Sequence, residues 1–166
     1  KGKLDFVSGI DASYKDEILT YEGALQDHYK DEFEVYRQPY LNTEYLGILV
    51  DEKAGVMQNN PLLDIRIRQA INYGFYRVKM MRYLRNNIGI PATNGMIPKG
   101  LPAFDTTLVN GYTYQPEKVK ALLAEAGYPG GKGLPEVTVQ TSAEYLDLCE
   151  YIQGEVSRMG IPLNVE

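Results

Sequence analysis

The sequence predicts an α/β domain in which helices flank a sheet. Its last third alternates a strand-like stretch at residues 137–141, a helical apolar stripe at 145–159 and a second strand-like stretch at 163–165. A strand–helix–strand order favours parallel pairing through a crossover connection. An almost continuous apolar run at 44–50 and a long helical pattern between residues 61 and 84 complete the α/β signature.

The N-terminal third predicts one short strand and then irregular surface structure. Apolar and polar residues alternate in the segment 3–9, and Ser8 and Gly9 end it as a turn. Residues 12–34 are polar and rich in tyrosine, with two short possible turns of helix. The next strand is expected at 44–50, because an apolar run of this length indicates a strand covered on both faces.

The middle of the chain predicts a long helix followed by a long connection. Pro61 suits the first turn of a helix, and apolar residues then recur at steps of three and four up to about residue 84. Residues 86–110 are rich in Gly and Pro and have no sustained period. Such a segment is expected to be a connection laid over the body of the domain.

Two further helices are expected from the signals at their ends. Pro116 opens the first of them, and Gly127 is its expected C-terminal stop. Ser142 is the expected cap of the second, which ends at Gly160. This second helix joins the two strand-like stretches of the crossover.

Composition and charge predict one acidic globular domain. The 166 residues are 44% hydrophobic and 23% charged, which suits a single core, so residues 1–166 are expected to form one domain. There are 22 acidic against 17 basic residues, a formal charge of −5. This balance argues against nucleic acid as a partner, since phosphate binding requires clustered Lys and Arg. No stretch approaches the roughly 20 apolar residues of a membrane-spanning helix.

The two ends of the sequence suggest a piece excised from a longer protein. The first residue is Lys1 rather than Met, and residues 161–166 have the pattern of a strand with no turn or polar tail after it. No basic-then-apolar leader opens the chain. We expect any export signal or membrane anchor to lie outside these residues.

Residues that carry common enzyme chemistry are scarce. His28 is the only histidine and lies in a polar, acidic stretch, where a solvated surface position is expected. Cys149, the single cysteine, falls at an apolar position of a predicted helix and is expected to be a buried thiol. These two residues do not supply the three or four ligands of a zinc site. We therefore expect no catalysis, no metal and no cofactor.

Two local patterns could bind anions, but each has a simpler structural interpretation. Residues 127–133 superficially suggest a phosphate loop, yet position 126 is not Gly and position 133 is not Ser or Thr. A helix stop followed by a tight turn is the better interpretation. Asp64, Arg66 and Arg68 lie beside a helix start, where a cap with surface ion pairs is favoured over an anion site.

Three segments form motifs with a specific order and spacing. Residues 115–129 combine a helical pattern with a Gly-Tyr-Pro exit, and 134–139 continue as a strand. Residues 64–74 form a second helix after a strand that begins Asn-Thr-x-Tyr-Leu at 42–46, and the loop 89–100 lies between the two helices. Together these segments resemble the ABC-transporter substrate-binding proteins specific for oligopeptides, dipeptides, nickel and related solutes.

The resemblance spans nearly the whole chain. It implies a type II periplasmic-binding-protein-like lobe with a mixed sheet flanked by helices, and most of the second ligand-gripping lobe of a longer, two-lobe protein. Such a protein captures an oligopeptide or similar small solute and delivers it to an ABC permease. A monomer is expected, periplasmic or extracytoplasmic, with any lipoprotein anchor outside this chain. The chain departs from the family at Tyr76 and Arg77, where Asp-Arg is usual, which bears on a local ion pair or cap.

Strand ends and helix starts that face the other lobe are the expected ligand contacts: Ser8, Gly9, Tyr45, Thr141 and Tyr145. A structural role competes at each position. It is a plain turn at Ser8 and Gly9, sheet packing at Tyr45, and capping or core packing at Thr141 and Tyr145.

Two other classes of function stay open. One is a small α/β transferase or hydrolase whose catalytic residues lack a recognised motif. The other is an interaction domain that binds another protein through its tyrosines between Tyr14 and Tyr45, since exposed tyrosines can serve as contact anchors. The solute itself is not predicted, because peptide, metal-chelate and sugar binders share these helices.

Overall fold

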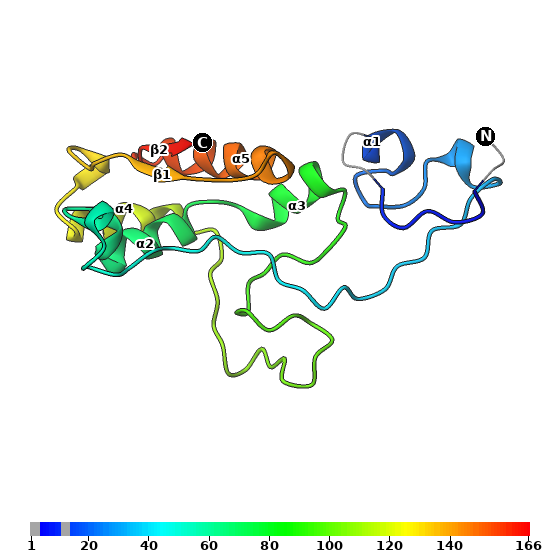
Figure 1. Ribbon diagram of the computed structural model, residues 1–166, viewed down its shortest axis with the longest axis horizontal. Helices are drawn as coiled ribbons and strands as arrows, with labels where there is room; N and C mark the ends of the chain where they lie inside the picture. Colours follow the sequence, from blue (N-terminus) through cyan, green and yellow to red (C-terminus); the bar gives the residue numbers. More distant parts are fainter. Residues whose placement is uncertain (1–3, 11–13) are drawn as a thin grey trace. The chain divides into compact units, whose positions relative to one another are not determined.

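The computed structural model describes residues 4–10 and 14–166, which gather into two compact units (Figure 1). Unit 1 comprises Lys1–Tyr40 and Val78–Pro91, and unit 2 comprises Leu41–Arg77 and Ala92–Glu166. Each unit therefore contains two stretches that are distant in the sequence. The assignment of all 166 residues to one domain stays a prediction.

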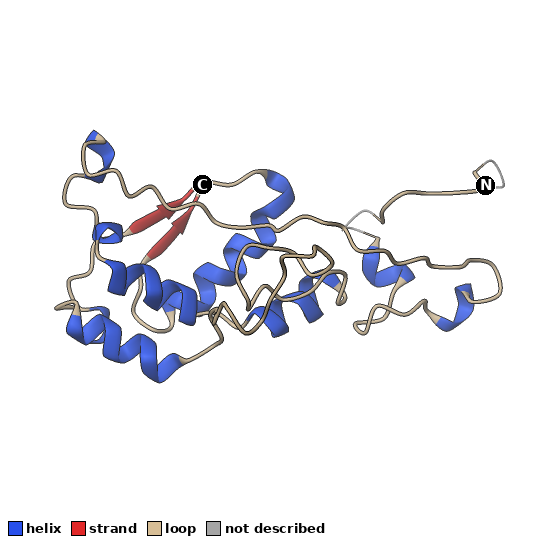
Figure 2. Cartoon of the chain, turned by 90° about the horizontal axis from the view of Figure 1, so that it is seen from below, coloured by secondary structure: helices blue, strands red, loops and turns tan. Residues whose placement is uncertain are grey.

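The carboxyl-terminal part of unit 2 is a parallel crossover (Figure 2). Strand β1 (Val137–Val139) pairs in parallel with β2 (Leu163–Val165). Helix α5 (Leu146–Ser157) connects them and is preceded by the 3-10 turn η5 (Ala143–Tyr145). The predicted strand–helix–strand unit and the α/β class are confirmed. The described sheet holds these two strands only, so the further strands expected of a mixed sheet are not among the described residues.

The core of unit 2 lies between this crossover and two packed helices. Helices α2 (Ile65–Tyr73) and α4 (Pro116–Glu125) lie against each other, and Val137 faces Leu163 in the strand register. Burying each such aliphatic side chain contributes about 1.5–3 kcal/mol relative to leaving it exposed. The buried apolar residues of these elements are Ile67, Ala70, Ile71, Val119, Leu122, Leu123, Val137, Cys149, Ile152, Val156 and Leu163.

Close packing of α2 against α5 depends on Gly74. A Cβ atom at this position would lie 3.0 Å from Val156 Cγ1 and 3.0 Å from the Ala70 carbonyl oxygen. Both distances are shorter than ordinary van der Waals contact, so a side chain here would force the two helices apart.

The helix expected between residues 61 and 84 is divided, which corrects the prediction. It consists of the 3-10 turn η3 (Pro61–Leu63), α2, and α3 (Arg77–Arg85), with a break at 74–76. Arg77 Nη1 donates to the Asn72 carbonyl at 2.8 Å, and Nη2 donates to Asn72 Oδ1 at 3.1 Å. The guanidinium thus donates to a carbonyl near the C-terminal end of α2. In a continuous helix, a backbone N–H of the next turn would donate to this carbonyl instead.

Two expected strands and one expected cap are wrong. Residues 4–9 and 44–50 have no strand structure, and Lys3 lies outside the described residues. A strand exists only through hydrogen bonds to a neighbouring strand, and neither segment pairs with the described sheet. Ser142 makes no side-chain cap bond; its carbonyl accepts from Tyr145 N at 3.0 Å, so α5 starts after a backbone turn.

Helix ends and turns elsewhere in unit 2 agree with the sequence. Pro116 lies in the first turn of α4, and Gly127 follows the helix with a φ of 92°. The Gly-rich stretch after it forms the 3-10 turn η4 (Pro129–Gly131), so the turn interpretation is confirmed. A further 3-10 turn, η2 (Gly55–Met57), precedes η3, and residues 86–110 contain no helix, as expected of a long connection.

Unit 1 contains α1 (Lys15–Ile18), the 3-10 turn η1 (Asp27–Tyr29) and α3 from Val78 onward. Its most buried polar residue is Asn86, which follows α3 with a φ of 46°. Asn86 Nδ2 donates to the Thr20 carbonyl at 3.1 Å. The end of α3 is therefore tied to the segment that follows α1.

Candidate functional site

The predicted contacts of unit 2 lie where the parallel strands end. Glu166 N donates to the Val139 carbonyl at 3.0 Å, and Thr141 N donates to the Glu166 carbonyl at 2.9 Å. These bonds continue the pairing of β1 and β2 beyond the strands. Thr141 is therefore held, half-buried, at the carboxyl end of the sheet immediately before η5.

Tyr145 brings a second chain segment to the same end of the sheet. Its hydroxyl donates to Glu44 Oε1 over a long 3.5 Å, although the two residues are 101 positions apart. Tyr45 follows Glu44 directly and is 71% exposed, so its ring is not packed in a sheet. We call the group formed by Glu44, Tyr45, Thr141, Tyr145 and Glu166 the carboxyl edge.

The structure thus brings three of the five predicted ligand contacts into one region. Ser8 and Gly9 belong to unit 1, where both are exposed. Gly9 has a φ of 82° and no atom within 4 Å of where a Cβ would stand, which suits the end of a turn. A ligand role for all five residues stays a prediction.

The carboxyl edge carries the chemistry of a binding surface. It offers two carboxylates, the hydroxyls of Thr141 and Tyr145, and an exposed aromatic ring at Tyr45. Such groups accept and donate hydrogen bonds and cover apolar surface. In unit 2, which is described throughout, and in the rest of the described chain, no group of three or more His, Cys, Asp or Glu residues could hold a metal ion.

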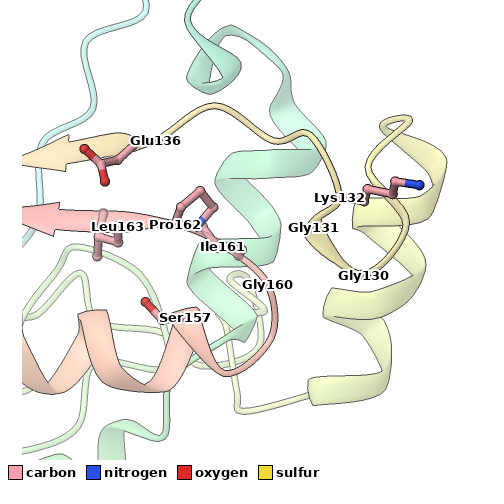
Figure 3. A pocket seen from close by; sticks show the side chains of 9 residues that line it. All are labelled: Gly130, Gly131, Lys132, Glu136, Ser157, Gly160, Ile161, Pro162 and Leu163. Atoms are coloured by element: carbon pink, nitrogen blue, oxygen red, sulfur yellow. The ribbon is translucent and has the colours of Figure 1, made fainter.

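A hollow at the opposite, amino-terminal end of the strands is a weaker candidate (Figure 3). It is widely open, and Figure 3 shows Lys132 and Glu136 on opposite sides of it. Its polar side chains therefore do not converge on one point. It is formed by turns that approach closely, since a Cβ at Gly131 would overlap the Gly160 carbonyl. In open parallel α/β sheets ligands bind at the carboxyl ends of strands, which favours the carboxyl edge.

The possible anion site at Asp64, Arg66 and Arg68 is engaged in bonds within the chain. Asp64 Oδ1 accepts from Arg66 N at 2.8 Å as the cap of α2, and Arg66 Nη2 donates to Asp64 Oδ2 at 2.6 Å. This guanidinium holds the pKa of Asp64 below its usual range. Arg66 also donates to the Glu125 carbonyl at 2.6 Å, and Arg68 donates to the Leu62 carbonyl at 2.7 Å. The predicted cap with ion pairing is confirmed.

The remaining chemical candidates also have structural roles. Cys149 is buried in α5, as expected, and His28 is exposed in η1, where its ring lies 4.1 Å from that of Tyr29. Glu44 and Glu166 were not singled out by the sequence. No local signal marks them, because each reaches the carboxyl edge only through contacts with residues far along the chain or across the sheet. Among the described residues no helix has both the length and the apolar character to cross a membrane.

Comparison with known proteins places the chain in a family. The family model described as bacterial extracellular solute-binding proteins, family 5 Middle, matches residues 1–166. The dipeptide-binding protein of Escherichia coli (strain K12) is 30% identical over 131 residues, which cover 76% of this chain and 23% of that protein. The chain therefore spans about a quarter of the length of this relative.

Solved structures agree with this match. The binding protein AgaA of A. tumefaciens R10, in complex with agropinic acid, is 32% identical with a TM-score of 0.55, over 64% of this chain and 22% of that one. DppA of Helicobacter pylori, in complex with the peptide STSA, is 26% identical with a TM-score of 0.53, over 65% and 20%. The type II periplasmic-binding-protein fold is thus confirmed. The chain belongs to the bacterial extracellular solute-binding proteins of family 5.

Proposed function

We propose that this chain is part of the solute-binding component of an ABC import system. The match of the family model to all 166 residues carries this proposal. The whole protein would enclose an oligopeptide or related solute between two lobes and deliver it to the membrane permease. Its role would be binding without catalysis, in an extracytoplasmic location, as a monomer that is anchored, where an anchor exists, through a segment outside this chain.

The carboxyl edge supports a place for solute contact within this chain. The Glu44 carboxylate accepts a long bond from Tyr145, so an N–H or ammonium group of a solute could replace that bond at a shorter distance. The Thr141 and Tyr145 hydroxyls would bond polar groups, and the exposed Tyr45 ring would cover an apolar part of the solute. We propose Ser8 and Gly9 as further contacts from unit 1.

Peptides are the solute class that we propose first. One relative is a dipeptide-binding protein, and one structural neighbour holds the peptide STSA. Another neighbour holds agropinic acid, so related small polar solutes are the second class. Binding would shift the population of the two-lobe protein toward a closed form that the permease recognises.

Native mass spectrometry of the full-length protein tests this proposal. After purification without denaturation, we expect a co-purifying solute whose mass is replaced when oligopeptides are added. Nickel chelates and oligosaccharides are the matched comparison ligands. If none of these ligands shifts either the mass or the melting temperature, the protein is not a receptor for the proposed solutes.

A further inference from the structure

Two Asn-Gly pairs lie side by side in unit 2. They are Asn94-Gly95 and Asn110-Gly111. A Cβ atom at Gly95 would lie 3.0 Å from Val109 Cγ1, which belongs to the residue before the second pair. A Cβ atom at Gly111 would overlap the carbonyl oxygen of Thr93, the residue before the first pair. The glycine of each pair therefore contacts the residue that precedes the other pair.

An Asn-Gly pair can deamidate by its own atoms, because the glycine nitrogen lies next to the side-chain amide. Glycine has no Cβ to shield that nitrogen, and its backbone turns with little strain. The nitrogen attacks the amide carbon, so a new C–N bond forms and the amide C–N bond breaks. The amide nitrogen leaves as ammonia with the proton of the attacking N–H. Water then opens the succinimide ring and leaves aspartate or isoaspartate.

The surroundings of Asn94 favour this reaction. Thr93 Oγ1 donates to Asn94 Oδ1 at 3.0 Å. A donor on this oxygen draws electron density from the amide carbon and stabilises the negative charge that develops on the oxygen during attack. In the part of the chain that the structure describes, no hydrogen bond engages Gly95 N or Asn94 Nδ2. The attacking nitrogen and the leaving nitrogen are therefore both free to move.

Asn110 lacks this arrangement. Its side chain is exposed and makes no hydrogen bond within residues 4–10 and 14–166. Gly111 packs against the Thr93 carbonyl, and a backbone neighbour this close restrains the movement that ring closure requires. At Gly95, by contrast, the nearest atoms belong to the Val109 side chain. Asn110 therefore has the same chemistry in different surroundings and serves as an internal reference.

We infer that Asn94 is a site of spontaneous deamidation, at which Gly95 N converts the side-chain amide to a carboxylate and the Thr93 hydroxyl is the activating donor. Water is the only other reactant, and nothing is oxidised or reduced. Neither a solute nor a permease takes part. The inference therefore does not depend on the proposed function, and either can fail without the other.

Deamidation would change the lining of a second hollow in unit 2. Asn94 lines this hollow together with Asp105 and with apolar side chains that include Met96, Phe104 and Leu108. A carboxylate at position 94 would add a second negative charge to a mainly apolar lining that already holds Asp105. Apolar surroundings and a like charge both disfavour an ionised carboxylate. We therefore expect residues 92–110 to open more readily after the conversion.

The experiment ages the full-length protein in mildly alkaline water labelled with heavy oxygen. Opening of the ring introduces the label, so mass spectrometry of peptides measures the rates at Asn94 and Asn110 separately. The same rates are measured in urea, where Thr93 no longer holds its hydroxyl on Asn94. We expect the ratio of the Asn94 rate to the Asn110 rate to be about twofold to tenfold higher in the folded protein, the effect of one hydrogen bond. An equal ratio in the folded and unfolded protein would show that the structure does not activate Asn94, and the inference would be wrong.

Two variants of Thr93 test the activating donor. Thr93→Val removes the hydroxyl and should slow conversion at Asn94 by about twofold to tenfold, without changing the rate at Asn110. Thr93→Ser keeps the hydroxyl and should convert as the wild type does. Melting temperatures identify any variant that is not folded, and the comparison of folded with unfolded wild type needs no variant. Wild-type conversion in a folded Thr93→Val protein would contradict the role of the hydroxyl.

Hydrogen exchange tests the effect on the second hollow. Asn94→Asp carries the charge of the product, and Asn94→Gln is the matched neutral variant. We expect faster exchange of residues 92–110 in the Asp variant than in the Gln variant, because only the Asp variant adds a charge to the lining. Equal exchange in the two variants would mean that the new carboxylate does not open this segment.

Discussion

The cap that joins α2 to α4 provides a quantitative test of how unit 2 is held together. Replacing Asp64 by Ala removes the side-chain acceptor for Arg66 N and also the carboxylate that binds the Arg66 guanidinium. Loss of an N-cap costs about 1 kcal/mol, within a range of roughly 0.5–2. The ion pair adds less than about 1 kcal/mol, because the Arg66 and Asp64 side chains are 43% and 26% exposed and solvent screens them.

We therefore expect Asp64→Ala to lower the local free energy of opening by about 1–2 kcal/mol. Asp64→Asn is the matched variant, since Asn caps as well as Asp but carries no charge, and it should cost about 0.5 kcal/mol. Hydrogen exchange with mass spectrometry on the full-length protein reports the opening of α2 and α4 separately from the rest of the molecule. If the Asn variant opens as readily as the Ala variant, the cap is not the main contribution and the reasoning fails.

The same carboxylate predicts a pH dependence with a definite sign. The pKa of Asp64 is depressed in the folded protein because Arg66 donates to it. The folded state therefore favours the ionised form, and its stabilisation is present above the ordinary aspartate pKa of about 3.9. It is lost as the pH falls below that value through the depressed pKa. Protection of the α2 amides in the wild type should decline below about pH 4, and this component of the decline should vanish in Asp64→Asn.

The other predictions concern packing and the carboxyl edge. Gly74→Ala should lower the free energy of unfolding by about 1–3 kcal/mol, because its new Cβ would overpack the contact with Val156. Gly154→Ala should raise the free energy of unfolding by about 0.5–1 kcal/mol, because Ala favours a helix and its Cβ would have no atom within 4 Å. Unfolding in urea measures both changes. Ile67→Ala, at a fully buried site, should cost about 2–5 kcal/mol, and Ile65→Ala, at a site 57% exposed, much less. Tyr145→Phe should weaken solute binding by about tenfold in calorimetry while leaving the melting temperature within about 2 °C.

Opposite outcomes would contradict particular parts of the structure. Equal effects of the two glycine variants would mean that α2 and α5 do not approach as closely as described. Equal losses of stability in the two isoleucine variants would mean that Ile67 is not part of the buried core. Unchanged solute affinity in Tyr145→Phe would exclude its hydroxyl from the proposed solute contacts.

Local signals in the sequence predicted the elements that depend on nearby residues. Helix α4 begins at Pro116 and is followed by Gly127 with a positive φ, because Pro fits a first turn and Gly fits a left-handed stop. The cap at Asp64 is equally local, since its acceptor and donor are two residues apart. The strand–helix–strand crossover followed from apolar periods of two and 3.6, which backbone geometry imposes on any buried strand and helix.

Pattern alone misjudged elements that depend on a partner. The apolar spacing runs on through the break at 74–76, because side-chain period does not show that Arg77 occupies the Asn72 carbonyl. The apolar residues in 4–9 and 44–50 favour burial. A strand, however, forms only where a neighbouring strand accepts and donates its backbone hydrogen bonds. The sequence predicted a possible protein-contact surface at the tyrosines between Tyr14 and Tyr45, whereas the packed tyrosines of unit 2 come from segments up to 78 residues apart, Tyr73 to Tyr151.

By itself, the sequence determined the fold class, the family resemblance and the two ends of α4. Each of these depends on contiguous motifs or on short apolar periods, which can be identified without the tertiary structure. Only the tertiary structure decided where distant side chains meet. The approach of Tyr145 to Glu44 across 101 positions, and the contact of Lys118 with the Tyr73 ring, are consequences of how distant segments of the chain pack together. Long-range contacts are selected by packing of the whole unit, and no local pattern records them.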